Sequence, residues 1–151
     1  MKSARWLYRK KTYRLATIVA GVLIFAVSSI PNLPQPEVQT EITRYRLDYF
    51  FHFLIFFIPG FTAAIWLTER NGKMASKKML ILLFVGILFG LVDEVHQLFI
   101  PGRRFNPFDF LYNAAGFSAG VLLTYHWVVR HLVIRKNYFP LLRKKLFDQS
   151  V

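Results

Sequence analysis

Four long apolar runs, separated by short basic segments, constrain the fold of this 151-residue chain more than any other feature. The runs cover residues 15–30, 49–67, 79–100 and 108–129. A helix needs about 20 residues to cross the hydrocarbon core of a bilayer, so the last three runs are long enough and the first is slightly short. A soluble domain of this size would instead spread its charges along amphipathic elements. The sequence therefore predicts an all-α polytopic membrane protein with four transmembrane helices.

The composition excludes several classes of protein. A net charge of +12 would suit a nucleic-acid-binding domain, but 54% of the residues are hydrophobic and leave little chain for a soluble fold that carries a basic face. We therefore expect no nucleic-acid partner. Because the chain has no cysteine, disulfides, thiolate chemistry and cysteine-ligated zinc are excluded. Nothing in the composition indicates a cofactor, and we expect none.

Lysine and arginine are distributed unevenly among the segments that flank the runs. Six precede the first run, four lie in residues 68–78 and six follow residue 129, whereas residues 31–48 and 101–107 hold two each. The positive-inside rule places the basic segments, and with them both termini, in the cytoplasm. We therefore divide the chain into a basic cytoplasmic N-terminus (residues 1–14), a four-helix membrane domain (15–129) and a basic amphipathic cytoplasmic tail (130–151).

Both basic ends leave an alternative open. The N-terminal segment and the first run have the order of a signal peptide, but the long basic lead with Trp6, Tyr8 and Tyr13 is more typical of an interfacial anchor, which we favour. The C-terminal tail either lies on the anionic inner leaflet or serves only to set the topology. Residues 31–48 contain three prolines and are expected to form an extended segment outside the membrane.

Polar residues near the ends of the runs are the candidates for function. Fourteen apolar residues precede Asp93 in the third run and would cover about 21 Å as a helix. Asp93, Glu94 and Gln97 are therefore expected in the outer leaflet or just below its headgroups. An ionisable group at that depth costs about 3 kcal/mol unless it is paired or hydrated, which makes it a functional candidate. Asp48 and His52, one helical turn apart, lie at the outer end of the second run.

The third and fourth runs carry the same spacing of small and polar residues in opposite order. At positions i, i+4, i+7 and i+11, the third run has Gly86, Gly90, Asp93 and Gln97, and the fourth has Asp109, Asn113, Gly116 and Gly120. Each set lies on one face of a helix. Because the two helices run in opposite directions, both sets place glycine in the inner half of the membrane. We predict that the two Gly-x-x-x-Gly faces pack against each other and that the polar residues share an outer cavity.

The connection between these two runs, residues 101–107, is short and basic. It carries Arg103 and Arg104 and begins with Pro101, which is expected to end the third helix. Asn106 followed by Pro107 has the order of an N-cap residue and a first helical residue. The two arginines are therefore held near the polar residues of both runs.

Each of these polar residues also has a purely structural interpretation. His52 and His96 would then be neutral, hydrogen-bonded packing residues, and Asp109 would be an acidic residue that stabilises the helix dipole. The carboxylates of the third and fourth runs would form ion pairs with the two arginines and hold the loop closed. Metal binding by the two histidines with a carboxylate lacks a recognised ligand motif, so we expect no metal site.

Three blocks of residues form a recognisable pattern. They are Asp48-x-x-x-His52-Phe53, Asp93-Glu94-x-His96-Gln97-x-Phe99-x-Pro101-Gly102-Arg103 and Asp109-x-x-x-Asn113-x-x-Gly116-x-x-x-Gly120. Together these blocks, within residues 45–125, resemble the VanZ-like family of small bacterial membrane proteins, in which His96 stands at a variable place. The resemblance implies a multi-pass protein of the bacterial cytoplasmic (inner) membrane. The name-giving member of the family is associated with resistance to the glycopeptide antibiotic teicoplanin.

Our preferred hypothesis is a protein that binds or shields an anionic amphiphile in the outer leaflet. The amphiphile would be a membrane lipid, a lipid-linked cell-wall precursor or a glycopeptide antibiotic. Arginine would hold its phosphate or carboxylate group in forked hydrogen bonds. The candidate ligand-binding residues are Asp48, His52, Asp93, Glu94, Gln97, Arg103, Arg104, Asp109 and Asn113.

Two other functions are compatible with the same residues. An intramembrane enzyme acting on a lipid headgroup or pyrophosphate would use His52 or His96 as base or nucleophile. We expect no serine in the polar cluster, because Ser28 and Ser29 end the first run and Ser118 lies deeper in the fourth, and this counts against an acyl-transfer hydrolase. An ion path would need polar residues where the inner halves of the runs carry glycine. We therefore favour binding over catalysis.

Overall fold

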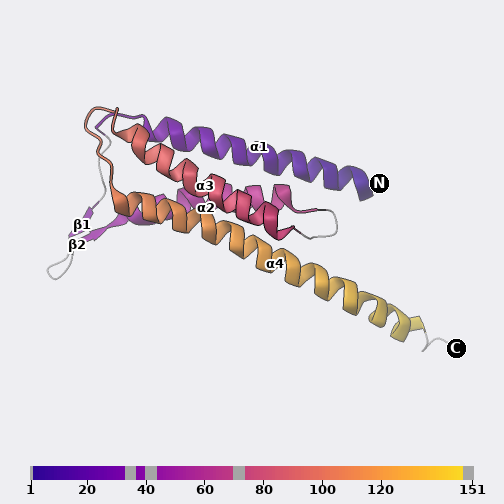
Figure 1. Ribbon diagram of the computed structural model, residues 1–151. Coiled ribbons are helices and arrows are strands. Elements are labelled where there is room, and N and C mark those ends of the chain that lie inside the picture. The colour runs from indigo at the N-terminus through magenta and orange to yellow at the C-terminus, as the bar shows by residue number, and fades with distance from the viewer. Residues whose placement is uncertain (1, 33–36, 40–43, 70–73, 148–151) are drawn as a thin grey trace.

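The computed structural model contains four α-helices and one pair of short strands within the residues that it describes, 2–32, 37–39, 44–69 and 74–147 (Figure 1). Side chains are described for residues 10–32, 47–69 and 74–127. The helices are α1 (Lys2–Ser28), α2 (Leu47–Leu67), α3 (Ser76–Gln97) and α4 (Pro107–Phe147). Strands β1 (Glu37–Gln39) and β2 (Arg44–Arg46) pair antiparallel, where the sequence indicates only an extended segment.

Three helical stretches in the described chain are long and apolar enough to cross a membrane. They are Lys10–Ser28 within α1, and the whole of α2 and α3. The predicted helical fold and its membrane character are therefore confirmed. The start of α4 is less apolar, because Asp109, Asn113 and Ser118 interrupt its sequence. A fourth crossing by α4 stays a prediction.

Two helices extend beyond the predicted runs. α1 begins at Lys2, inside the basic lead, and α4 continues past residue 129 to Phe147 without a break. With 41 residues, α4 is about 60 Å long. Lysine and arginine are good helix formers, so a change from apolar to basic sequence need not end a helix. The boundaries expected after residues 14 and 129 are therefore not helix ends.

Turn-forming residues determine how α3 is joined to α4. Asn106 accepts a hydrogen bond on its side-chain Oδ1 from the backbone N–H of Phe108 at 3.0 Å, and Pro107 is the first residue of α4. The predicted N-cap is therefore confirmed. Gly102 has a φ of 78°, and a Cβ at this position would overlap the side chain of Asn32. The loop consequently packs directly on the residues that follow α1.

The helices alternate in direction, so α1 and α3 end where α2 and α4 begin (Figure 1). We call this the polar end of the bundle (residues 28–32, 47–52, 93–97 and 101–113). α2 is the central helix: its largest interface is with α4 and its next largest is with α1. α3 packs mainly on α4. α1 and α4 therefore cover different sides of α2.

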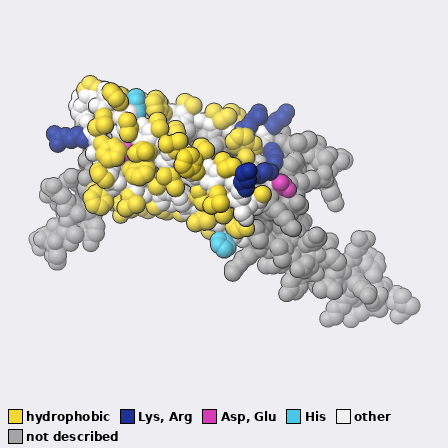
Figure 2. Space-filling view, in the orientation of Figure 1, with side chains coloured by type: hydrophobic (Ala, Val, Ile, Leu, Met, Phe, Trp, Pro, Cys, Tyr) yellow, Lys and Arg dark blue, Asp and Glu magenta, His cyan; other side chains and the backbone are white. Residues whose placement is uncertain are grey.

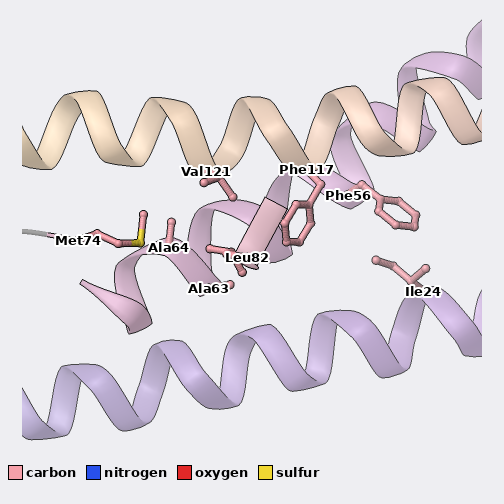
Figure 3. Packing of buried hydrophobic residues seen from close by; sticks show 8 residues of the cluster. All are labelled: Ile24, Phe56, Ala63, Ala64, Met74, Leu82, Phe117 and Val121. Carbon is pink, nitrogen blue, oxygen red and sulfur yellow. The ribbon is translucent and has the colours of Figure 1, made fainter. Parts of the chain in front are cut away.

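A small apolar core lies between the helices, away from the polar end. Its buried members come from all four helices and the segment before α3: Ile24, Phe56, Ala63, Ala64, Met74, Leu82, Phe117 and Val121 (Figure 3). The outward faces are also apolar, with Leu15, Leu80 and Phe84 each more than 60% exposed. Figure 2 shows hydrophobic side chains across the described face of the bundle and lysine or arginine at its two ends. This distribution suits a bundle that is surrounded by lipid.

The glycines of α4 pack against α2 rather than α3. A Cβ at Gly116 would overlap the backbone carbonyl of Phe53, and a Cβ at Gly120 would overlap that of Phe57. Gly60 of α2 contributes to the same interface, since its own Cβ would overlap the backbone of α4. The prediction that the two Gly-x-x-x-Gly faces meet is therefore wrong. Spacing places glycines on one face of a helix without identifying the helix that packs against that face.

The glycines of α3 do face α4, but they accommodate side chains instead of backbone. Gly86 lies under the aromatic ring of Phe117, which would overlap any Cβ there. Gly90 lies against the Cβ of Asn113, which would be 3.3 Å from an added Cβ. α3 is thus positioned by the side chains that α4 inserts into it, and the polar residues that follow Gly90 are brought up to the start of α4.

Candidate functional site

Seven polar or charged side chains are buried at the polar end of the bundle, among the residues described. They are Ser28, Asp48, Asp93, Glu94, Gln97, Asp109 and Asn113. With His52 and Arg103, which are partly exposed, we call these residues the polar cluster. Burying a polar group is costly unless it is hydrogen-bonded, so the partners of each member indicate its role.

Glu94 is the centre of a hydrogen-bond network that joins α3 to α4. Its side chain is fully buried. One carboxylate oxygen, Oε2, accepts a hydrogen bond from the backbone N–H of Asn106 at 3.3 Å. The other, Oε1, accepts from the side-chain amides of Asn113 at 3.3 Å and Gln97 at 3.4 Å. Glu94 therefore supports the N-terminus of α4 and the loop before it.

His52 connects α2 to the same network. Its Nδ1 lies 2.9 Å from Oδ1 of Asn113, and its Nε2 lies 3.7 Å from Oδ2 of Asp109. Because the amide nitrogen of Asn113 donates to Glu94, its oxygen faces the imidazole and accepts from Nδ1. Both ring nitrogens of His52 are thus directed at α4. This arrangement orients the ring and offers no support for a role as base or nucleophile.

A cavity of about 620 Å³ lies between α1 and α2 and ends at the polar cluster. Most of its wall is apolar and includes Val19 and Leu23 of α1 and Phe51 and Ile55 of α2. Leu23 is 57% exposed and Phe51 is 48% exposed although both line the cavity, so the cavity is open along its side. The polar lining is confined to one part and consists of Ser28, Asp48, His52, Asp93, Gln97 and Arg103.

Two polar atoms at this end of the cavity lack partners. Nε of Arg103 and Oδ1 of Asp93 are both buried, and neither has a hydrogen bond within the described part of the chain. The second oxygen of Asp93 is 3.5 Å from the amide nitrogen of Gln97, which is a long contact. A buried polar group without a partner in a native protein calls for an explanation, such as a bound molecule.

The interpretation of Arg103 and Arg104 as ion-pair partners is not supported. The described residues provide neither arginine with an ion pair to a carboxylate. Arg103 lines the cavity and is partly buried, whereas Arg104 is exposed and is not part of the cavity wall. The two arginines, equivalent in the sequence, therefore differ in the structure: of the two, Arg103 lines the cavity, and a role of Arg104 in binding stays a prediction.

The contribution of α1 to the site was missed, and the expectation that the polar cluster has no serine is wrong. Ser28 lines the cavity beside Asp93, and the Oγ of Ser29 is 3.0 Å from Nε2 of His96. The hydroxyls of Ser28 and Ser29 both donate to the backbone carbonyl of Phe25, at 3.0 and 2.6 Å. A serine that donates to its own helix is not activated as a nucleophile.

His96 holds the end of α1 against α3. Its ring stacks on Phe25 with centroids 4.2 Å apart, in addition to its contact with Ser29. His96 is thus a packing residue, in agreement with its structural interpretation. A signal for α1 exists in the sequence, because Ala16, Ala20, Ile24 and Ser28 recur every four residues along one face and end in a polar group.

The residues described do not bring any three histidine or acidic side chains close enough together to hold a metal ion. His52 and His96 lie apart, since one faces α4 and the other faces α1. The chemistry that the site offers is hydrogen bonding and charge beside an apolar cavity. That combination fits a molecule with a polar head and an apolar chain.

Comparison with known proteins identifies the family. A family model described as VanZ/LLP1 matches residues 6–130, which include the cavity, the polar cluster and all of α2 and α3. No curated protein and no solved structure matches the chain. The match covers most of the sequence, and it agrees with the resemblance carried by the three blocks of residues. The chain therefore belongs to the VanZ/LLP1 family.

Proposed function

We propose that this protein binds one amphiphile from the surrounding membrane in the cavity between α1 and α2. The apolar chain of the amphiphile lies between the helices and its head reaches the polar cluster. In this proposal the protein crosses the bacterial cytoplasmic membrane four times with both termini inside, as the distribution of basic residues favours. The polar end, with the head of the ligand, then lies at the extracytoplasmic face.

The proposal depends mainly on one observation: one part of the cavity wall is apolar and the other part is polar. Its apolar part runs along α1 from Ala16 to Val27, about 17 Å of helix. Its polar part contains Asp93 and Arg103, each with a buried atom that has no hydrogen bond within the described residues. Water alone would suit the polar part and lipid alone would suit the apolar part, whereas an amphiphile satisfies both.

Arg103 is the residue best placed to hold an anionic group. Its guanidinium is always charged and presents several N–H donors in a plane that matches phosphate or carboxylate oxygens. It lines the cavity without an ion-pair partner in the described chain. The buried network around Glu94 fixes the loop that carries it, through the bond to the backbone of Asn106. Glu94, Asp109 and Asn113 are therefore positioning residues in this proposal.

Three kinds of amphiphile have this chemistry: an envelope lipid, a lipid-linked cell-wall precursor and a lipoglycopeptide. Capture of the last at the extracytoplasmic face would shield its target and would account for a role in glycopeptide resistance. Each of the three has an apolar chain that matches the α1–α2 cavity and an acidic group that matches Arg103. The identity of the co-purifying molecule distinguishes between them.

Native mass spectrometry of the detergent-extracted protein tests the proposal. The wild type is expected to carry one bound amphiphile, and Arg103→Ala is expected to lose it. Arg104→Ala is the matched control, because it removes the neighbouring arginine, which does not line the cavity. Equal binding by Arg103→Ala and the wild type would overturn the role of Arg103. Absence of any bound amphiphile from the wild type would overturn the proposed function.

A further inference from the structure

We propose that the head of the bound amphiphile carries a primary ammonium group beside its anionic group, and that Asp93 binds the ammonium. The ligand is then a zwitterionic aminophospholipid of the membrane. This inference rests on the proposed function and narrows it, because an acidic head alone would satisfy Arg103 and would leave Oδ1 of Asp93 without a hydrogen-bond donor.

The polar end of the cavity is lined by acidic side chains as well as by Arg103. Arg103 is the one basic side chain, among those described, whose charge is permanent and which lines this cavity. Asp48 and Asp93 line the same end, and the acidic side chains of Glu94 and Asp109 are buried close behind them. A purely anionic head would offer Arg103 a partner but would bring no donor to the acidic side chain of Asp93. A head that carries both signs of charge matches the cavity better.

Asp93 is buried and has one carboxylate oxygen that can still accept a hydrogen bond. It is 98% buried, since its relative exposure is 2%. Its Oδ1 has no hydrogen bond within the described residues, and its carboxyl group is flanked by the amide of Gln97, 3.5 Å from Oδ2, and by the side chain of Ser28. A carboxylate buried to this extent is retained only with a charged or hydrogen-bonding partner. Because Asp93 lines the cavity, a ligand can supply that partner.

The chemistry of Asp93 selects a primary ammonium over other heads. A primary ammonium provides three N–H donors and one positive charge, and so satisfies a buried carboxylate in both respects. A quaternary ammonium has no N–H donor and is recognised by aromatic rings instead. A sugar hydroxyl donates a hydrogen bond but leaves the negative charge of the carboxylate uncompensated. In ethanolamine phosphate the ammonium is two carbons from the phosphate ester, and Arg103 and Asp93 line the same cavity, so one head presents a group of each charge to that lining.

The test uses the full chain in detergent and three phospholipids with identical acyl chains, titrated singly and in pairs under native mass spectrometry. The lipids are phosphatidylethanolamine, phosphatidylcholine and phosphatidylglycerol. The wild type is expected to retain phosphatidylethanolamine about tenfold more strongly than either of the others, since a hydrogen bond to a charged group changes affinity by roughly this factor or more. Equal or stronger retention of phosphatidylglycerol would overturn the inference and leave the proposed function intact.

Asp93→Asn provides the matching test on the protein. It keeps the shape of the side chain and removes its charge. The preference for phosphatidylethanolamine over phosphatidylglycerol is therefore expected to fall from about tenfold to none. Arg103→Ala is expected to weaken all three phospholipids together. An unchanged preference in Asp93→Asn would overturn the assignment of Asp93. If Asp93→Asn does not fold, the comparison of the three lipids on the wild type decides by itself. A wild type that retains none of them overturns this inference, whereas the proposed function is decided by the co-purifying amphiphile.

Discussion

The imidazole of His52 and the side-chain amide of Asn113 face each other between α2 and α4, with Nδ1 of His52 2.9 Å from Oδ1 of Asn113. The amide nitrogen of Asn113 donates onward to Glu94 of α3 at 3.3 Å. One fully buried asparagine therefore connects three helices beneath the proposed ligand site. Its hydrogen bonds join the three helices at the polar end through side chains of the protein alone.

Asn113→Ala is expected to lower the free energy of unfolding by about 1–3 kcal/mol, because it removes the partner of one imidazole nitrogen and one of the donors to a buried carboxylate. The nitrogen is Nδ1 of His52, and the carboxylate oxygen is Oε1 of Glu94, which keeps its contact with Gln97. Thermal unfolding in detergent measures the effect, with Leu111→Ala on the exposed face of α4 as the control. Combined with His52→Ala, the two effects are expected to be less than additive. Strict additivity would contradict a direct hydrogen bond.

Gly116→Val is expected to separate α2 from α4, because a side chain at this position would overlap the backbone carbonyl of Phe53. Overpacking of this kind costs about 1–3 kcal/mol or more where backbone cannot move aside. The control is Ala115→Val, which makes a similar change at the exposed neighbouring position. A drop in Tm for Gly116→Val alone is the expected result. Equal Tm values for the two variants would mean that the close approach is absent.

Arg103→Lys is expected to weaken binding of the amphiphile although it preserves the charge. Lysine is a point charge on a flexible stem, whereas arginine presents a planar fork to two oxygens. Loss of one charge-assisted hydrogen bond corresponds to about a tenfold fall in affinity. Lipid titration under native mass spectrometry measures it. Wild-type affinity in the lysine variant would show that charge alone is recognised.

Ala20→Trp is expected to fill the apolar part of the cavity and to exclude the chain of the amphiphile. Ala20 lines the cavity, whereas Val22 is 63% exposed and is not part of its wall. Val22→Trp is therefore the control for adding a large ring to the same helix. We expect lipid to be lost from Ala20→Trp and retained by Val22→Trp, at unchanged Tm. Retention by both variants would place the chain outside the cavity.

The proposed topology is open to a direct test, because the chain has no native cysteine. Arg104→Cys in the α3–α4 loop is expected to react with a membrane-impermeant maleimide on intact cells. Lys77→Cys, at the start of α3, is expected to react only after the cells are permeabilised. Ser150→Cys is expected to behave like Lys77→Cys. Labelling of Ser150→Cys on intact cells would show that α4 does not return the chain to the cytoplasm.

Residue spacing was sufficient to predict which polar residues would gather at the polar end. Asp93 and Gln97 share a helix face, as do Asp109 and Asn113, and antiparallel helices bring both pairs to the same end of a bundle. The N-cap at Asn106 was predictable as well, because it depends only on neighbouring residues. These features are local or follow from periodicity, which the sequence determines directly.

The features that the sequence did not predict depend on which helices become neighbours. Gly116 and Gly120 meet α2, because its backbone near Phe53 and Phe57 is the surface that fits them. The role of α1 was missed because its contribution is mostly apolar and resembles any lipid-facing helix. The difference between Arg103 and Arg104 depends on how one loop folds back on Asn32. None of these follows from spacing along a single helix.

Under the proposed function, the open side of the cavity has a consequence for how a lipid would be selected. An apolar chain that moves sideways from lipid into the space beside Leu23 and Phe51 exchanges one hydrocarbon environment for another. Such a transfer removes no apolar surface from water and therefore has almost no hydrophobic driving force. Discrimination between the many chains of the bilayer then falls to the few polar atoms around Asp93 and Arg103. The protein would therefore select lipids by their headgroups, because the surrounding bilayer consists of molecules with similar acyl chains.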